Sequence, residues 1–327
     1  MRTICLTVAY DGTNYCGWQW QANGVSLQET LEAALAKFTG ETIRVTAAGR
    51  TDAGVHALAQ LVSFHTATAI PPLGFQLGLR GILPDDIVIR DAVERPYGYS
   101  ARFDSIRKRY RYVIHNARSP WPGLRNQTWF VRWALDDAAM QAAANVLLGT
   151  HDFRCFESKW PNTESSVRTI HEARFWRTPV WQPWNASDHF AESMQMVTTP
   201  TNVTESGLSK RASTIVPEDS TLPEFLCFDI VANGFLYNMV RTIVGTLVHV
   251  GRGHWTTDDI HRILETGDRR YAGDTAPACG LSLVEIDAPV DEARIADRLE
   301  RYRQKQAMLG AVALDEVLEE ETDTLTD

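Results

Sequence analysis

Residues 48–57 read Ala-Gly-Arg-Thr-Asp-Ala-Gly-Val-His-Ala, and the rest of the chain is organised around this stretch. It places one guanidinium, one carboxylate and one imidazole within seven residues, between apolar flanks. Because glycine tolerates positive φ, Gly49 and Gly54 predict the edges of a sharp loop. Such a loop would hold Arg50 and Asp52 in the fixed geometry that catalysis requires. From spacing alone, a plain turn in which Asp52 bonds its own backbone is an equally good interpretation.

The segments before and after this loop predict an α+β fold. Apolar residues alternate over residues 3–10, which is typical of a half-buried strand. Ser26 with Glu29 fits a capping box, and the apolar stripe that follows predicts a helix that ends at Gly40. Strands are expected over residues 43–47 and 61–65, so Asp52 should lie at a strand end.

Further elements are expected along the rest of the chain. Helices are predicted over residues 71–80, from a cap at Asp136 or Asp137 to about residue 147, and over 258–266 behind Thr257. A strand is expected over 225–231, a largely buried helix from Leu236 to Leu247, and a terminal helix from Pro289 onward.

The most basic stretch, residues 107–114, reads Arg-Lys-Arg-Tyr-Arg-Tyr-Val-Ile. In a strand, Tyr110 and Tyr112 would point to one face, and Arg109 and Arg111 to the other. Cations interleaved with aromatic rings suit RNA, because cations meet phosphates and rings stack on bases. A strand with a solvated basic face and core tyrosines is the alternative, and the residues alone favour it.

Arg241 lies within the apolar stripe of the buried helix. Since arginine is almost never buried without a partner, this side chain predicts a nearby anion. The alternative is an arginine that extends to the surface from the helix edge.

Composition limits the class of protein. The chain has 327 residues and a formal charge of −9, but residues 315–327 hold seven acidic and no basic residues, which leaves 34 acidic against 32 basic elsewhere. A near-neutral body can still carry a basic groove, since electrostatic steering depends on local charge. Five scattered cysteines predict free thiols rather than disulfides or a metal site. No segment predicts a membrane span or a signal peptide, so a cytoplasmic location is expected.

Periodically spaced apolar residues become few between residues 181 and 224, a segment that is rich in Ser, Thr, Asn and Pro. We interpret this segment as a partly mobile insertion between two strands. Three regions are expected: an N-terminal half over 1–105, a C-terminal half over 106–290 with the insertion, and a terminal helix with an acidic tail over 291–327.

Several motifs resemble the tRNA pseudouridine synthase A family. The stretch Gly-Arg-Thr-Asp-Ala-Gly-Val-His-Ala at 49–57 resembles its signature, and Tyr-Asp-Gly-Thr at 10–13 with Gly-Trp-Gln at 17–19 resembles its opening motif. Phe-Leu-Tyr-Asn-Met-Val-Arg at 235–241 and Gly-Leu-Ser-Leu at 280–283 resemble two later motifs. The chain departs from the family at Ser100, where the family usually has histidine.

The resemblance implies roles for individual residues. Asp52 would be the catalytic carboxylate, Arg241 its ion-pair partner, and Tyr110 the active-site tyrosine that stacks on uracil. Leu283 would line the uridine pocket. Arg50, beside Asp52, is the candidate to occupy the space that the flipped nucleotide vacates or to hold the flanking phosphate. Candidates for RNA backbone contacts are Lys108, Arg109 and Arg111.

The resemblance also implies an architecture and a reaction. Two similar halves, each a mostly antiparallel sheet backed by helices, would enclose the active-site cleft. The enzyme would be a homodimer that isomerises uridine to pseudouridine at positions 38–40 of the tRNA anticodon stem-loop. The reaction requires no cofactor, since nothing is oxidised or hydrolysed. Asp52 could attack C1′ or abstract the 2′ proton, and the sequence leaves both routes open.

Two other functions fit parts of the sequence less well. A non-catalytic RNA-binding protein would not need Asp52, Tyr110 and Arg241 together. An aspartate-nucleophile hydrolase that acts on small phosphates usually has a second acidic residue for Mg²⁺ close to the nucleophile, and Gly54 occupies that position here.

Overall fold

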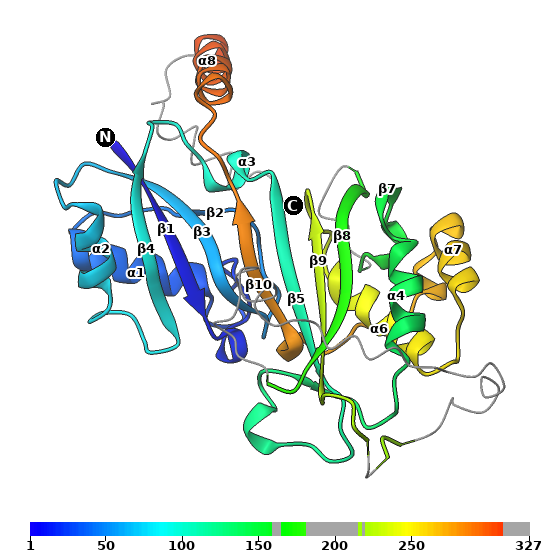
Figure 1. Cartoon of the computed structure of the whole chain (residues 1–327). Helices are drawn as coiled ribbons and strands as arrows, with labels where there is room; N and C mark the ends of the chain where they lie inside the picture. Colours follow the sequence, from blue (N-terminus) through cyan, green and yellow to red (C-terminus); the bar gives the residue numbers. More distant parts are fainter. Residues whose placement is uncertain (159–164, 181–214, 218–219, 310–327) are drawn as a thin grey trace. The chain divides into compact units, whose positions relative to one another are not determined.

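The computed structural model describes residues 1–158, 165–180, 215–217 and 220–309. The chain divides into two compact units (Figure 1). Among the described residues, unit 1 comprises 1–108 and 285–309, and unit 2 comprises 109–158, 165–180, 215–217 and 220–284. Strands and helices occur in both units, which confirms the α+β class. The insertion at 181–224 lies mostly outside the described residues, and the acidic tail lies entirely outside them.

Unit 1 contains an antiparallel sheet in the order β4 (Ile87–Arg95), β1 (Arg2–Tyr10) and β3 (His56–Thr66). The short strand β2 (Thr46–Ala47) pairs with β3. Hydrophobic side chains from the inner face of β1 and β3, such as Leu6 and Phe64, are buried. The residues between β2 and β3 include the signature stretch, so the sheet itself positions both ends of that loop.

Two helices pack on this sheet. In α1 (Leu27–Thr39), the Ser26 hydroxyl accepts the Glu29 N–H, and Gly40 adopts φ 77° at the C-terminal end, as predicted. In α2 (Pro72–Leu79), Phe75 packs edge-on against Phe64 of β3 and against Phe38 of α1. The short turn η1 (Gly12–Asn14) follows β1, and α3 (Ala101–Asp104) precedes β5 (Arg107–His115).

The terminal helix α8 (Glu292–Leu309) belongs to unit 1 and confirms the helix expected there. Its Arg298 donates hydrogen bonds to both carboxylate oxygens of Asp104, at 2.9 and 2.7 Å, and to the Gly98 carbonyl at 2.6 Å. Ile295 packs in one cluster with Cys5 and Tyr99. A buried ion pair thus ties α8 to the body of unit 1.

Unit 2 contains the strand order β10 (Leu281–Asp287), β5, β9 (Phe225–Ala232), β8 (Val167–Thr178) and β7 (Gly149–Asp152). Arg107 and Lys108 of β5, and residues 285–287 of β10, are counted in unit 1. The short strand β6 (Trp129–Phe130) runs parallel to β5. Strands β8 and β9 form an antiparallel pair in which Phe175 and Phe228 stack at 4.5 Å.

Three helices complete unit 2. In α4 (Asp137–Asn145), Asp136 is the cap, and Gln141 bonds the backbone of β8 at Ala173 and Phe175. The buried helix α6 (Met239–Gly251) packs against α4, and α7 (Thr257–Thr266) is capped by Thr256 in a capping box with Asp259. The remaining turns are η2 (Pro122–Leu124), η3 (Arg154–Phe156), η4 (Arg269–Tyr271) and η5 (Ala278–Gly280).

Several predicted boundaries were wrong. The strand expected over 43–47 is reduced to two residues, because the Glu32 side chain takes the Val45 N–H. The strand expected over 61–65 extends from His56 to Thr66. Helix α6 begins at Met239 rather than Leu236, and the cap of α7 is Thr256 rather than Thr257. Strand β4 had no predicted counterpart.

Within the part of the chain that the structure describes, no helix combines the length and the apolar content that crossing a membrane requires.

The Arg298–Asp104 pair provides a stability test. Both side chains are buried, at 8% and 1% exposure, so Arg298→Met should leave an uncompensated charge on Asp104. We expect the free energy of unfolding to fall by about 3–5 kcal/mol in urea titrations. The control Arg301→Met removes a surface pair with Asp297 and should change stability by less than about 1 kcal/mol. Equal losses in the two variants would contradict the role of the buried pair.

Candidate active site

Asp52 lies in a tight turn that connects β2 to β3. The Ala48 N–H donates to the Leu61 carbonyl at 2.9 Å, which extends the strand pairing to the start of the turn. The Val55 N–H donates to the carbonyl of Asp52 itself at 3.1 Å, and Gly54 has φ 78°. The sharp loop predicted from the two glycines is therefore present, with the positive φ at Gly54.

The backbone of the loop that follows β1 packs directly against the backbone of this turn. The Trp18 N–H donates to the Thr51 carbonyl at 2.9 Å, and Gly17 has φ 106°. A Cβ on Gly17 would lie 2.8 Å from the same Thr51 oxygen, and a Cβ on Gly12 would overlap the Val55 carbonyl. These contacts leave room only for glycine, and they fix the backbone on both sides of Asp52.

A buried hydrogen bond between two side chains also holds this turn in place. The Tyr10 hydroxyl lies 2.8 Å from the Thr51 hydroxyl, and both residues are buried. Burial raises the pKa of Tyr10, so the phenol remains protonated at physiological pH. The Gly12 N–H donates to Nδ1 of buried His56 at 3.1 Å. Side-chain hydrogen bonds at Thr51 and His56 thus hold the residues on either side of Asp52.

Three charged residues that the sequence predicts to belong to the site lie at this turn within unit 1: Arg50, Asp52 and Lys108. Arg50 is exposed and Asp52 is half-buried. The end of the Lys108 side chain lies beside Gly49, where an added Cβ would be 3.5 Å from Nζ. Lys108 is therefore close to the loop that carries Asp52.

Arg241 extends from the first turn of α6 in unit 2, and two oxygen atoms orient its guanidinium. Its Nε donates to the Ala276 carbonyl at 2.8 Å, and one terminal nitrogen donates to Oδ1 of Asn238 at 2.6 Å. These two hydrogen bonds fix the orientation of the guanidinium.

Asn238 has an unusual backbone. Its φ is 61°, and it is the only non-glycine residue with positive φ in the described part of the chain. It occupies the N-cap position of α6, yet its side chain makes no capping bond. Instead, Oδ1 accepts from Arg241 and Nδ2 donates to the Ser158 hydroxyl at 2.7 Å. The strained backbone thus directs this amide toward Arg241.

Tyr110 and Leu283 are buried in unit 2. The Tyr110 ring meets Phe235 edge-on, with centroids 5.1 Å apart and planes at 86°. Leu283 is fully buried on β10. The Tyr112 hydroxyl donates to the Pro277 carbonyl at 2.7 Å, and burial raises the pKa of Tyr112, which keeps it protonated as a donor. This bond anchors the segment that leads into Leu283.

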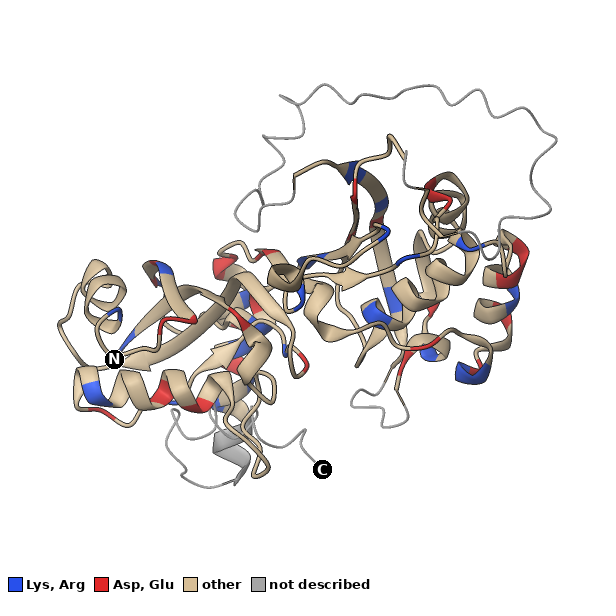
Figure 2. Cartoon of the chain, turned by 90° about the horizontal axis from the view of Figure 1, so that it is seen from below, with Lys and Arg blue, Asp and Glu red and all other residues tan. Residues whose placement is uncertain are grey.

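Arg109 and Arg111 share one face of β5, as the alternation predicted, and both engage carboxylates of neighbouring strands. Arg111 is 8% exposed and donates to both oxygens of Asp229, at 2.6 and 2.7 Å. Arg109 pairs with Glu172 at 3.2 Å. Basic and acidic positions are interspersed throughout both units (Figure 2). The RNA contacts expected of Arg109 and Arg111 remain a prediction, and within the sheet both side chains pair with carboxylates.

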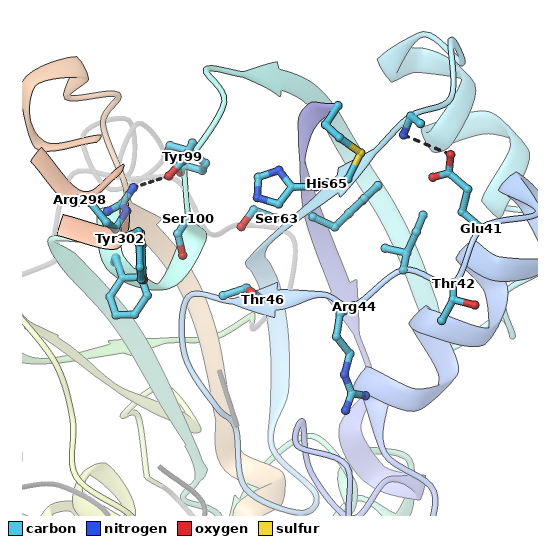
Figure 3. A pocket seen from close by; sticks show the side chains of 16 residues that line it. Glu41, Thr42, Arg44, Thr46, Ser63, His65, Tyr99, Ser100, Arg298 and Tyr302 are labelled. Carbon is cyan, nitrogen blue, oxygen red and sulfur yellow. Dashed lines mark hydrogen bonds between the residues drawn. The ribbon is translucent and has the colours of Figure 1, made fainter. Parts of the chain in front are cut away.

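Unit 1 also contains a cavity of about 210 Å³, lined by residues of β2, β3, α8 and the segment before α3 (Figure 3). Its polar groups bond to the surrounding structure. Glu41 accepts from the Ala67 N–H at 3.2 Å, and the Ser63 hydroxyl accepts from the Ala101 N–H at 2.9 Å. None of the predicted site residues lines this cavity. Among the described residues, no three His, Cys, Asp or Glu side chains form a group that could hold a metal ion.

Sequence reasoning missed two parts of this arrangement. The Tyr10–Thr51 bond joins residues 41 positions apart, and no local pattern indicates it. Asn238 could have been found, since asparagine is enriched at left-handed positions and lies three residues before Arg241. Asp52 belongs to unit 1, whereas Tyr110 and Arg241 belong to unit 2, so the predicted Asp52–Arg241 ion pair remains a prediction.

The structure therefore defines an α+β protein that presents a carboxylate on a rigid turn. The sequence matches the family model described as tRNA pseudouridine synthase over residues 6–104 and 143–287. It is 38% identical to a tRNA pseudouridine synthase A of Thermoanaerobacter sp. (strain X514) over 286 residues, covering 88% of this chain and 99% of the relative. Proteins of the same name from Acetivibrio thermocellus and Roseiflexus sp. (strain RS-1) are each 40% identical, covering 88% and 91% of this chain, and 99% and 94% of the relatives. The chain belongs to the tRNA pseudouridine synthase family.

The close packing at Gly12 can be tested directly. Gly12→Ala should lower the free energy of unfolding by about 1–3 kcal/mol, because the added methyl group overlaps the Val55 carbonyl and forces the backbone apart. Gly81→Ala is a matched control, since a Cβ there meets no atom within 4 Å. Chemical denaturation measures both. A Gly12→Ala protein as stable as the control would show that the contact does not constrain the turn.

Proposed function

We propose that this protein isomerises uridine to pseudouridine at positions 38–40 of the tRNA anticodon stem-loop. Membership of the tRNA pseudouridine synthase family supports the reaction. The observation that carries the proposal is the turn at Asp52, where backbone contacts from Trp18 and Val55 fix the residues around one carboxylate.

The reaction exchanges one bond of uridine for another. The glycosidic bond between N1 and C1′ breaks, the uracil rotates, and C5 bonds to C1′. The proton on C5 leaves and N1 gains one, so the atoms of the nucleoside are conserved. Asp52 would act at the sugar, either as a nucleophile at C1′ or as a base that removes the 2′ proton. Both roles require the carboxylate to be ionised.

Arg241 is proposed to keep Asp52 ionised. A carboxylate in an apolar pocket tends to protonate, and an arginine within ~4–6 Å lowers its pKa by ~1–3 units. The bonds to Asn238 and Ala276 support this role, because they hold the guanidinium in one orientation before substrate binds. Fixed charges of this kind need no reorganisation during the reaction.

The remaining site residues are proposed to bind the flipped nucleotide. A base paired in a stem must leave the helix, which costs a few kcal/mol. Tyr110 would stack on the uracil and take the C5 proton, and Leu283 would form an apolar wall. Exposed Arg50 would occupy the vacated space, and Lys108, beside Gly49, would contact the RNA backbone.

We also propose a homodimer in the cytoplasm. Both follow from the family resemblance and from the proposed tRNA substrate.

Replacement of Asp52 tests the reaction. Asp52→Asn should keep the fold and tRNA affinity but lower pseudouridine formation by more than about 1000-fold, because the amide neither attacks carbon nor accepts a proton. Tritium release from tRNA labelled at uridine C5 measures the rate. Substantial activity in the Asp52→Asn protein would reject the assignment, and an inactive wild-type protein would reject the function.

Replacement of Asn238 tests the positioning of Arg241. Asn238→Ala removes one acceptor from the guanidinium and should lower kcat about 10- to 100-fold with little change in KM. Asn238→Gly fits φ 61° without strain, so it separates the hydrogen bond from the backbone. We expect both variants to lose activity. An Asn238→Gly protein with the wild-type kcat would show that only the backbone conformation matters.

A further inference from the structure

The region around β5 differs in charge from the rest of the chain. Residues 105–135 contain no Asp or Glu and seven basic residues: Arg107, Lys108, Arg109, Arg111, Arg118, Arg125 and Arg132. The whole chain carries a formal charge of −9. Carboxylates of other strands engage Arg109 and Arg111. Three of the seven, Arg118, Arg125 and Arg132, follow the strand and are exposed.

Residues 117–128 form a loop between β5 and β6, which we call the basic loop. Residues 118–123 are all exposed, and Trp121 at the centre is 63% exposed. An exposed indole offers a flat aromatic face on which an unpaired base can stack. Arg118 and Arg125 are both exposed in the same loop.

The basic loop is rigid at its tip. Pro120 and Pro122 flank Trp121, and each fixes its own φ. The Leu124 N–H donates to the Trp121 carbonyl at 2.9 Å, which closes the turn η2. The Arg125 guanidinium donates to the Pro122 carbonyl at 3.0 Å, so one cation is held on the turn that follows Trp121.

The base of the loop is also fixed. The Asn116 amide donates to the carbonyls of Val131 and Trp133, at 2.9 and 2.7 Å. The Cys279 thiol donates to the Thr128 carbonyl at 3.4 Å, which links the loop to the segment before β10. A rigid loop presents its indole at a low entropic cost of binding.

We propose that the basic loop is a tRNA-binding surface, in which Trp121 stacks on an unpaired base and Arg118 and Arg125 contact the adjacent phosphates. This inference rests on the proposed function. Aromatic stacking with flanking cations is a common way of binding single-stranded RNA. The loop begins seven residues beyond Tyr110, and the strand between them extends to His115, so the loop starts roughly 20 Å from Tyr110. The base it binds is therefore not the uridine being modified, and we assign it to the anticodon loop.

The test compares tRNA binding and turnover. Trp121→Ala should raise both Kd and KM for tRNA about 5- to 100-fold with kcat unchanged, since one stacked base contributes about 1–3 kcal/mol. Trp121→Phe should retain part of the affinity. The double variant Arg118→Ala/Arg125→Ala should reduce the slope of log K against log salt by about 1–2.

Matched controls lie elsewhere on the surface. Tyr271→Ala removes an exposed aromatic ring, and Arg262→Ala/Arg301→Ala removes two exposed cations. Neither should change Kd by more than about twofold. A Trp121→Ala protein with the wild-type Kd overturns the proposal. So does a change in dimer dissociation, by sedimentation velocity, with tRNA affinity intact, because the loop would then bind a second copy of the chain. Since Kd does not depend on catalysis, an inactive wild-type protein rejects the proposed function while the binding comparison still tests the loop.

Discussion

The contact between two backbones around Asp52 is the constraint on which the account depends. The loop after β1 approaches the turn so closely that Gly12 and Gly17 leave no room for a side chain. One hydrogen bond, from Trp18 to Thr51, joins the two loops directly. Because backbone atoms cannot change rotamer, this arrangement fixes the start of the Asp52 side chain more firmly than side-chain packing would. A carboxylate held in this way is suited to act on one atom of a substrate.

Two arginines of unit 2, Arg111 and Arg241, have different hydrogen-bond partners and serve different purposes. Arg111 is paired with Asp229 inside the sheet, so its charge is cancelled and its contribution is structural. Arg241 is oriented by an amide and a backbone carbonyl, which hold its guanidinium in one direction. The proposed mechanism needs an oriented cation, since a guanidinium close to an acid favours the ionised form of that acid. The backbone conformation of Asn238 indicates that the protein accepts local strain to orient this group.

Local signals predicted a good part of this structure. The cap at Ser26, the helix end at Gly40 and the glycine-edged turn each depend on neighbouring residues, and the structure confirms them. Contacts between distant residues could not be predicted in the same way. Asp229 lies 118 positions from Arg111, and Asp104 lies 194 positions from Arg298. The sequence therefore predicted a basic strand, but not which of its cations the fold would pair with carboxylates.

The central claim is that this chain forms pseudouridine in the anticodon stem-loop through Asp52. Mapping pseudouridine in tRNA from cells that lack the gene tests it most directly. The account predicts unmodified uridine at positions 38–40, and restoration of the modification by the wild-type gene but not by one that encodes the Asp52→Asn variant. Pseudouridine at all of these positions in the absence of the gene would contradict it.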